Sequence, residues 1–306
     1  MEVDRQASLQ HHLQRRARII HAIRSFFVDS DYLEVETPIR IPAPAPEAHI
    51  NAVATGDWYL QTSPELCMKR LLAAGFPRIF QICKCFRHKE RGSRHLPELT
   101  MLEWYKTGCD YMDLMNECED LIRSVARQLK VNTTISFQDR PIRIDDAWTR
   151  MQVATAFQRY ASKTMEKALA EDCFDEIMVT EIEPNLGFPT PLFLYDYPAV
   201  HGALARLKPR DDSLAERFEL YIGGLELCNG FSELNDPEEQ QARFEAEQRL
   251  RTSFGYPVYP MPQKFLAALK DMPDACGNAL GIDRMVMLFC DAAEIDDVVT
   301  FTPEEL

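Results

Sequence analysis

The sequence predicts an α+β fold in which helices flank an antiparallel β-sheet. Two observations lead to this fold class. Strand-like segments at 79–87 and 99–106 are joined by a charged loop, as in a β-hairpin, and helix-like segments surround such hairpins at the periphery. This mixture favours an antiparallel sheet over a doubly wound parallel one. Neither a G-x-G-x-x-G turn after a strand nor a G-x-x-x-x-G-K-[ST] loop occurs, so the two common nucleotide cradles are missing.

The N-terminal half is expected to begin with an amphipathic helix at 9–30, where apolar residues recur at helical spacing. Residues 32–38 alternate like a strand that closes on Pro38, and a stiff proline-rich connector follows at 41–46. A short strand at 58–62 and a helix at 65–74 come before the hairpin. A helix at 110–129 follows it, with an apolar face formed by Met112, Met115, Cys118, Leu121, Ile122 and Val125.

Residues 131–192 carry the weakest pattern, a helix near 150–170 and a later apolar strand, and are interpreted as a helical insertion. Strands resume at 193–198 and 217–227, with Gly223-Gly224 as the expected turn. A Glu- and Gln-rich helix is expected at 237–252. A short helix is expected at 264–269, and residues 279–282 then lead into a buried helix at 283–290.

Composition excludes several classes of protein. The 306 residues carry 34 Lys and Arg against 48 Asp and Glu, a net charge of −14, which argues against binding nucleic acid by bulk electrostatics. No apolar run approaches the roughly 20 residues of a membrane helix, and the N-terminus has no stretch of signal-peptide type. The nine Cys lack zinc-knuckle spacing, so they are expected to be reduced thiols of a cytoplasmic protein rather than metal ligands.

Three groups of residues are candidates for chemistry. The first is the hairpin loop, where Arg87 enters a segment with five further basic side chains. Guanidinium groups bind phosphate oxygens bidentately, so this cluster suits a triphosphate. The alternative is a solvated hairpin tip with surface charges. The five basic residues are His88, Lys89, Arg91, Arg94 and His95.

The second group consists of carboxylates in apolar contexts: Glu65, Glu103, Glu219, Glu226 and Glu233. A buried carboxylate must meet a cation, because burying it unpaired costs several kcal/mol. The cation is Mg²⁺, a substrate ammonium, or an arginine such as Arg217 or Arg206 in a structural ion pair. The third group is the glycine-rich segment 277–284, where Gly281 allows close approach of a ligand and Arg284 opens a helix.

Together these blocks resemble the catalytic core of class II aminoacyl-tRNA synthetases, most closely the lysyl branch. Residues 34–38 (EVETP) resemble the first class II motif, which lies at a dimer interface; 86–105 resemble the second; 281–284 (GIDR) resemble the third. Residues 218–236 are similar to the lysyl-specific block. The resemblance spans nearly the whole chain, so residues 1–306 are expected to form one catalytic domain without an anticodon-binding domain.

The resemblance is closest to freestanding lysyl-type paralogues that attach (R)-β-lysine to a lysine side chain of elongation factor P. Ser63 stands where synthetases usually have Ala, and Ala279 stands where they have Gly. The methyl group of Ala279 would crowd an α-amino group, whereas a β-amino group lies one carbon further on. The resemblance implies a homodimer that uses ATP and Mg²⁺, with tRNA an unlikely partner.

The resemblance also implies roles for individual residues. Arg87 and Arg284 would act in catalysis, and Glu219 and Glu226 would hold Mg²⁺. Binding of the amino acid would involve Ser63, Glu65, Glu103, Tyr105, Asn229, Phe231, Glu233 and Ala279. Binding of ATP would involve Arg87, His88, Lys89, Glu90, His95, Glu226, Leu227, Gly281 and Arg284.

The sequence departs from the family at three positions of the second motif, the first of them His88, which stands in place of an Asn. Lys89 stands where the family has a Glu that contacts adenine, and Leu96 replaces an Asn. Lys89 cannot accept a hydrogen bond from the adenine amine, so Glu90 or a backbone carbonyl takes over this contact, or ATP binds differently. Two other functions stay open: a truncated lysyl-tRNA synthetase-like enzyme that activates α-lysine, and a catalytically silent paralogue that binds an amino acid and regulates.

Overall fold

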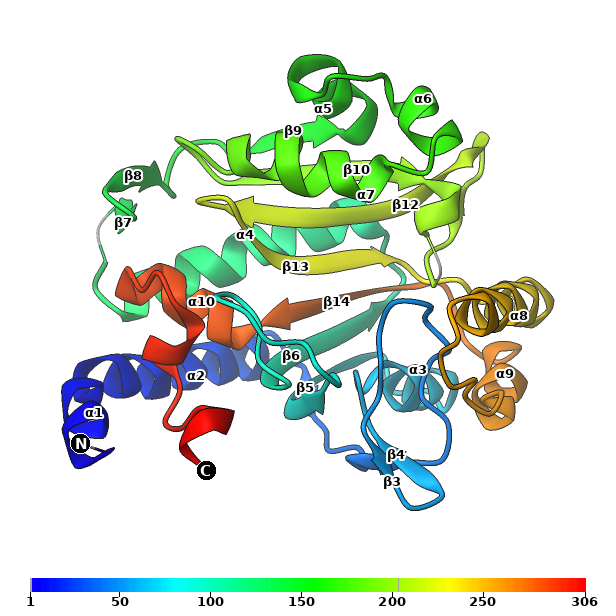
Figure 1. The fold of residues 1–306 in the computed structure, drawn as a ribbon, viewed down its shortest axis with the longest axis horizontal. Helices are drawn as coiled ribbons and strands as arrows, with labels where there is room; N and C mark the ends of the chain where they lie inside the picture. The colour runs from blue at the N-terminus through cyan, green and yellow to red at the C-terminus, as the bar shows by residue number, and fades with distance from the viewer. Residues whose placement is uncertain (1, 132, 203) are drawn as a thin grey trace.

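The computed structural model describes residues 2–131, 133–202 and 204–306. Within them, a nine-stranded mixed sheet runs through the centre of the molecule (Figure 1). Its pairs are antiparallel except β1–β5 and β9–β10. The predicted α+β class with a largely antiparallel sheet is therefore confirmed. The path across the sheet is β1 (Leu33–Glu34), β5 (Arg78–Phe86), β6 (Glu98–Thr107), β14 (Ala275–Gly281), β13 (Leu225–Ser232), β12 (Asp211–Ile222), β10 (Leu192–Pro198) and β9 (Thr149–Gln152), with β11 (Leu207–Lys208) beside β12.

One face of the sheet is covered by α2 (Gln10–Asp29), α4 (Tyr111–Gln128) and α10 (Ile282–Cys290). The main apolar core lies between these helices and the strands, with Phe27, Trp104 and Phe218 among its largest buried side chains. Asp110 begins α4 as its N-cap, accepting hydrogen bonds from two backbone N–H groups of the first turn. The predicted apolar face of this helix is buried from Met115 to Val125.

Three helices pack near the other face of the sheet: α3 (Glu65–Ala73), α8 (Pro237–Ser253) and α9 (Gln263–Leu269). They share a second apolar cluster with Tyr105. Asp236 caps α8 by accepting hydrogen bonds from Glu238 N and Glu239 N. A separate sheet of β2 (Arg40–Ile41), β4 (Trp58–Leu60) and β3 (Ala54–Thr55) lies below it in Figure 1. The expected strand at 58–62 therefore belongs to this small sheet, because its partners are Arg40–Ile41 and Ala54–Thr55.

A helical cap stands between β9 and β10 at the top of Figure 1. It has its own apolar cluster, which includes Phe157, Phe174 and Ile182. The cap consists of α5 (Val153–Tyr160), α6 (Met165–Ala170), α7 (Phe174–Ile177), a π-helical turn (Met178–Ile182) and a 3₁₀ turn (Glu183–Asn185); β7 (Thr134–Phe137) and β8 (Arg140–Arg143) form a hairpin before it. Because β9 and β10 both belong to the main sheet, the weakly patterned segment contributes strands to that sheet as well as helices.

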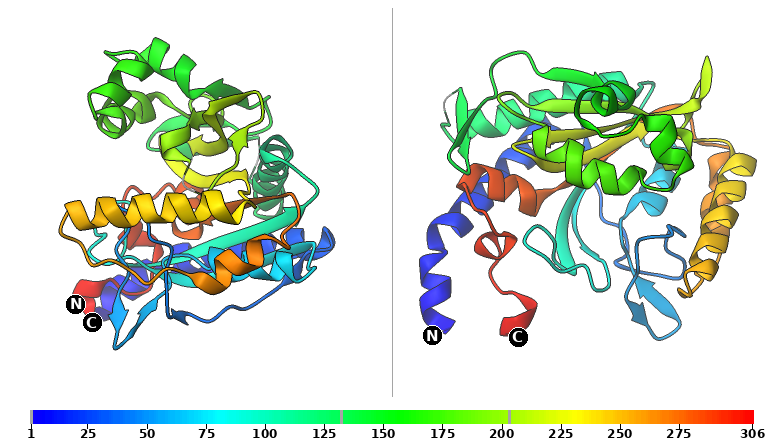
Figure 2. Two further views of the ribbon diagram at one scale, coloured as in Figure 1. Left: turned by 90° about the vertical axis from the view of Figure 1, so that its right-hand side faces the viewer. Right: turned by 45° about the horizontal axis from the view of Figure 1, so that its top comes forward.

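Three sequence expectations need adjustment at this level. Of the segment 32–38, only Leu33–Glu34 pairs as a strand, although Val35 N still donates to Phe80 O (2.9 Å). The chain leaves the sheet before Pro38, which has no N–H to donate to a ladder. Residues 217–227 are the adjoining parts of β12 and β13, with the predicted turn at Gly223 and Gly224, both of which have positive φ. A helix α1 (Glu2–Ser8) precedes α2 and runs beside the C-terminal segment, where Arg5 pairs with Glu305 at 2.8 Å (Figure 2).

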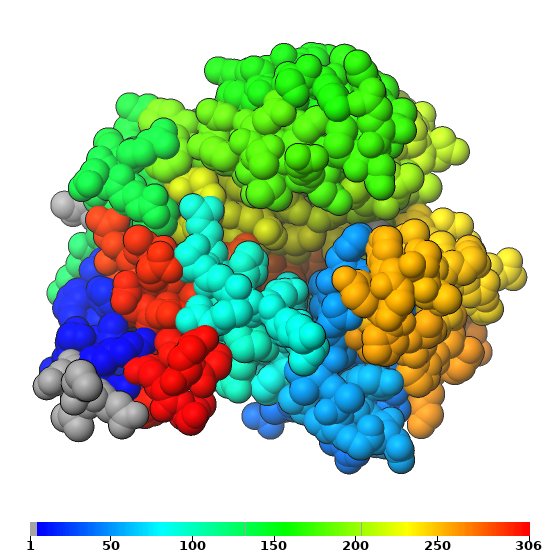
Figure 3. Space-filling view, in the orientation of Figure 1, coloured from blue at the N-terminus to red at the C-terminus, as the bar shows by residue number. Residues whose placement is uncertain are grey.

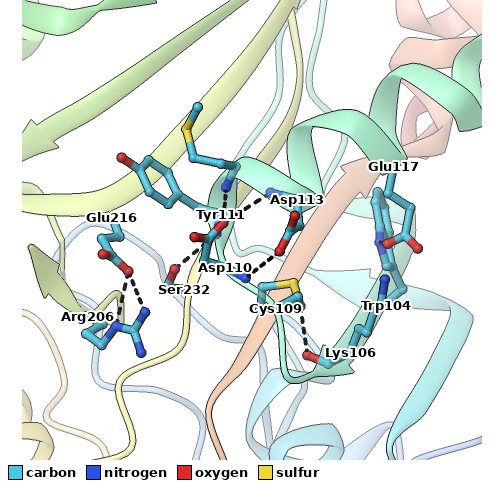
Figure 4. The surroundings of a disulfide bond; sticks show 12 residues. Trp104, Lys106, Cys109, Asp110, Tyr111, Asp113, Glu117, Arg206, Glu216 and Ser232 are labelled. Atoms are coloured by element: carbon cyan, nitrogen blue, oxygen red, sulfur yellow. Dashed lines mark hydrogen bonds and ion pairs between the residues drawn. A yellow bond between two sulfur atoms is a disulfide. The ribbon is translucent and has the colours of Figure 1, made fainter.

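Cys109 and Cys276 form a disulfide that joins the loop after β6 to the start of β14. The expectation that every cysteine is a free thiol is therefore wrong for these two, because the fold brings together residues 167 positions apart. Figure 4 shows the surroundings of this disulfide. Beside the N-cap of α4, Tyr111 N donates a hydrogen bond to the hydroxyl of Ser232 in β13 (3.0 Å). Among the residues that the structure describes, no helix is both long and apolar enough to cross a membrane.

Candidate active site

A cavity of about 450 Å³ opens on the face of the sheet opposite α2 and α4. Figure 3 shows this face hollowed between the loop after β5, the segment before β4 and the helical cap. A volume of this size is ordinary for a site that binds small molecules. Its floor is formed by β6, β12, β13 and β14, and its rim by the loop 87–97 and the start of α10.

The floor is built from two rows of side chains that run across four strands. In the first row, Glu219, Asn229, Ala279 and Glu103 are direct cross-strand neighbours. Successive side chains of a strand alternate between faces, so the row two residues away also faces the cavity. Both rows line it. The second row is Arg217, Phe231, Gly277 and Tyr105.

Gly277 makes this floor possible. A Cβ at this position would come within 2.3 Å of both the Tyr105 ring and a carboxylate oxygen of Glu233. Any side chain would therefore force the two apart. Glycine here lets the two side chains lie together across β14.

One end of the cavity is acidic. Glu103 accepts hydrogen bonds from the Ser63 hydroxyl (2.6 Å) and the Tyr105 hydroxyl (2.9 Å). Glu65 is the first residue of α3, and its backbone N–H donates to the Ser63 hydroxyl (3.0 Å). Burial, followed by the nearby charge of Glu65, raises the pKa of Glu103 to about 8, although the hydrogen bonds oppose this shift.

Glu233 lies behind this end, buried beside Tyr105 and outside the cavity lining. Its carboxylate pairs with the Lys69 ammonium, which also pairs with Glu65 at 2.6 Å. Burial raises the pKa of Glu233 to about 8, against the opposing charge of Lys69. The side chains of Glu65, Tyr105 and Glu233 therefore lie close together at this end, linked by Lys69 and by the gap at Gly277.

The other end of the cavity is cationic. Arg284 donates to the backbone carbonyl of Glu226 (2.8 Å) and pairs with its carboxylate (3.2 Å). Its guanidinium also donates to His95 Nε2 (2.6 Å). Burial, and then the charge of Arg284, lower the pKa of His95, so the ring is neutral at pH 7 and accepts this bond. Arg87 lines the cavity on the side of the hairpin and approaches Glu90 at 3.6 Å.

Glu219 and Glu226 differ in their surroundings. Glu219 pairs with Arg217 (2.6 Å) and accepts hydrogen bonds from the hydroxyls of Tyr197 (2.6 Å) and Tyr221 (2.7 Å). The sequence analysis left open whether a buried carboxylate meets Mg²⁺, a substrate ammonium or an arginine, and Glu219 pairs with Arg217. Burial raises the pKa of Glu219. Burial opposes ionisation of Glu226 too, but the charge of Arg284 prevails and lowers the pKa of Glu226.

The cavity brings together most of the candidate residues, but not all of them. His88 and Lys89 are exposed and do not line it, because the hairpin loop turns outward there, with positive φ at Lys89. Leu96 is buried and lines the wall. The candidates that line the cavity are Ser63, Glu65, Arg87, Glu90, His95, Glu103, Tyr105, Glu219, Glu226, Leu227, Asn229, Phe231, Ala279, Gly281 and Arg284.

Sequence reasoning missed Lys69 and Glu47. Lys69 could have been found, since it lies four residues after Glu65 in a predicted helix, the spacing of an ion pair. Glu47 lines the cavity from the position directly after the proline-rich connector, and burial raises its pKa to about 7. No periodicity in the connector indicates this contact.

Comparison with known proteins places the chain in a family. Residues 1–305 match the family described as tRNA synthetases class II (D, K and N). The chain is 41% identical to a protein of Erwinia tasmaniensis and 40% identical to one of Edwardsiella ictaluri, in both cases over 95% of this chain and 94% of the relative. A Proteus mirabilis protein is 39% identical over 94% of each chain. All three are named elongation factor P–(R)-β-lysine ligase. This chain therefore belongs to the tRNA synthetases class II (D, K and N) family.

Proposed function

We propose that the protein is an ATP-dependent ligase that activates (R)-β-lysine and transfers it to a lysine side chain of elongation factor P. One observation carries this proposal: a single cavity joins a buried acidic end to an arginine-lined end. Carboxylates bind the ammonium groups of a diamino acid, and guanidinium groups bind the phosphates of ATP. The names of the three relatives agree with this assignment.

The acidic end suits the amino acid. Glu65 would hold the amino group nearest the carboxylate, and Tyr105, with Glu103 nearby, would hold the distal ammonium. Glu233, which the sequence analysis also assigns to this ammonium, would supply its counter-charge from behind the floor, next to Tyr105. Ala279 lies between Asn229 and Glu103 in the floor, so its methyl group projects where the first amino group would lie. This crowding favours a β-amino over an α-amino group. Phe231 lines the same floor as a wall.

Activation needs positioning and charge stabilisation rather than a covalent enzyme nucleophile. The substrate carboxylate attacks the α-phosphorus of ATP, a new C–O–P bond forms, and the bond to the β-phosphate breaks, releasing pyrophosphate. Arg87 would hold the α-phosphate and the carboxylate together. Arg284 and the neutral His95 would hold the outer phosphates. Glu90 lines the cavity whereas Lys89 is exposed, which favours Glu90 for recognition of adenine.

Glu219 and Glu226 would hold Mg²⁺ together with phosphate oxygens. Mg²⁺ is commonly bound by one or two carboxylates plus substrate phosphates, and this pair fits that pattern. Glu226 is the more available ligand, with a side chain 37% exposed, while both Glu219 oxygens already accept from Arg217 and two tyrosines. The described part of the chain contains no group of three or more His, Cys, Asp or Glu residues arranged for a metal. When bound, the ion would neutralise charge on the phosphates.

In the second step, a deprotonated lysine amine of elongation factor P attacks the acyl carbon of the adenylate. The new amide bond forms, AMP leaves, and the amine gives up a proton. The open side of the cavity, between the hairpin loop and the helical cap, would admit this side chain (Figure 3). The net charge of −14 gives tRNA no electrostatic attraction to the molecule as a whole.

The proposal includes a homodimer of a cytoplasmic enzyme. Val28 (58%) is exposed at the end of α2, and Leu33 (51%) and Ile39 (45%) are exposed on either side of residues 34–38, the segment that resembles the first class II motif. Exposed large apolar side chains near this segment support a contact between subunits there.

Mass spectrometry of elongation factor P tests the proposal. The factor is incubated with this protein, ATP, Mg²⁺ and either (R)-β-lysine or α-lysine. We expect a β-lysyl adduct on one lysine and little adduct with α-lysine. Charging of tRNA with α-lysine by the purified protein would instead support a lysyl-tRNA synthetase-like enzyme, and failure to form any adenylate would support a silent paralogue.

A further inference from the structure

Lys69 is a buried cation behind the acidic end of the cavity. It lies on α3, one turn after Glu65, and its side chain has no solvent exposure. Its ammonium pairs with Glu65 (2.6 Å) and Glu233, and lies 5.1 Å from the centre of the Phe231 ring. A lysine is almost never fully buried without such partners. Lys69 therefore connects a carboxylate of the cavity wall with one behind the floor.

The charges at this end do not cancel. Three carboxylates, those of Glu65, Glu103 and Glu233, face a single ammonium. Both oxygens of Glu103 accept from hydroxyls, which do not compensate its charge. Fully ionised, these four side chains carry three negative charges and one positive charge, so two negative charges remain. Glu47, the other cavity carboxylate near Glu65, also faces Arg87 and Arg217 and is counted with those cations. A ligand with two ammonium groups balances them, and a ligand with one does not.

We propose that Lys69 is a positioning residue that aligns Glu65 with Glu233 and limits the uncompensated charge of the site to two, which selects a diammonium amino acid. This inference rests on the proposed function. It adds a physical reason why the enzyme would select an amino acid with two ammonium groups. Lys69 reaches the substrate only through the two carboxylates. If Lys69 were needed for packing alone, its replacement would not change which charged ligands the site binds.

The charge balance makes opposite predictions for single and double variants. Glu233→Gln leaves one uncompensated negative charge, and Lys69→Met leaves three, so each should raise the KM for β-lysine about 30-fold or more. The double variant Lys69→Met/Glu233→Gln restores two uncompensated negative charges. Its KM for β-lysine should therefore lie below that of either single variant, although the charge of Glu233 behind the distal ammonium stays lost.

A merely structural ion pair also predicts that the double variant is more stable than the single variants, because removing one partner leaves the other charge buried and unpaired. The two roles therefore differ in the KM of the folded variants, which a merely structural role leaves unchanged for β-lysine. The assay is pyrophosphate exchange with β-lysine, with the KM for ATP measured alongside and expected to stay within about twofold. Lys264→Met is the matched control, since this exposed lysine of α9 lies outside the cavity lining, and it should behave like the unchanged protein. Circular dichroism establishes that each variant folds.

The pH profile gives a second measurement. Glu233 faces Lys69 and Glu65 from α3, and Glu103 and Tyr105 from β6, so removing Lys69 leaves only negative or neutral neighbours. In Lys69→Met, the pH at which β-lysine begins to bind should move upward. A double variant no better than the singles, together with an unmoved pH profile, would overturn the inference. If the unchanged protein fails to activate β-lysine at all, the proposed function is wrong instead.

Discussion

The two ends of the cavity are built in different ways. The acidic end is anchored in regular elements, with Lys69 on α3, Tyr105 on β6 and Glu233 directly after β13, all of them buried. The cationic end depends on the hairpin loop, and its Arg87 and Glu226 side chains are partly exposed. Charges in the buried end are strong and must be matched, whereas charges in the partly exposed end are weakened by water. The amino acid is therefore expected to be selected more stringently than the nucleotide.

The largest expected effect comes from removing one buried charge. Glu233→Gln should weaken binding of β-lysine by about 2–5 kcal/mol, or about 30- to 5,000-fold, because a buried ammonium loses its counter-charge. Titration calorimetry of β-lysine against the variant measures this loss. Unchanged affinity would show that Glu233 does not hold the distal ammonium.

The glycine of the floor should come next. Gly277→Ala would push a methyl group into Tyr105 and Glu233, costing about 1–3 kcal/mol of stability and raising the KM for β-lysine. Gly92→Ala in the hairpin loop is the matched control, since nothing lies within 4 Å of its Cβ. Thermal unfolding and pyrophosphate exchange of both variants check this. Equal effects would mean that the floor is not closely packed.

Protons should accompany binding at the acidic end. Burial raises the pKa of both Glu103 and Glu233 to about 8, so these carboxyls are largely protonated at pH 7 in the empty site. An ammonium ligand favours the charged carboxylate, and binding at pH 7 should therefore release protons, with less release at pH 9. Calorimetry in two buffers of different ionisation enthalpy measures the number released. Proton uptake at pH 7 would contradict this explanation.

Salt should weaken binding of ATP more than binding of β-lysine. Raising KCl from about 0.05 M to about 0.5 M should increase the KM for ATP several-fold, because partly exposed charges are screened, and should change the KM for β-lysine less. Steady-state kinetics at constant pH gives both values. A larger effect on β-lysine would reverse the comparison between the two ends.

The smallest expected effect concerns the methyl group of Ala279. Ala279→Gly should shift preference towards α-lysine by about 1 kcal/mol or less, the scale of one buried methyl group. The ratio of kcat/KM for the two lysines measures this shift. If the ratio does not change, the argument that the methyl group of Ala279 crowds an α-amino group has no support.

The sequence could predict the acidic and cationic residues but not their full arrangement. Alternation in the hairpin puts Glu103 and Tyr105 on one face of a strand, and this was predictable from period-two spacing. The register that brings Ala279 between Asn229 and Glu103 was not, because β14 joins β6 to β13 from far along the chain.

Long-range contacts were likewise beyond the sequence pattern. The Cys109–Cys276 disulfide joins residues 167 positions apart, and nothing in their spacing indicates a pair. The partner of Glu233 was equally hidden: although Lys69 follows Glu65 at helical spacing, its second contact depends on how α3 packs against the end of β13.

Pyrophosphate exchange with three amino acids tests the central claim most directly. The substrates are (R)-β-lysine, α-lysine and a β-amino acid of the same length that lacks the distal amine. The two-ammonium site predicts rapid exchange with (R)-β-lysine, slower exchange with α-lysine and almost none with the monoamine. Exchange with the monoamine as rapid as with (R)-β-lysine would contradict the claim that the buried carboxylates select a diammonium substrate.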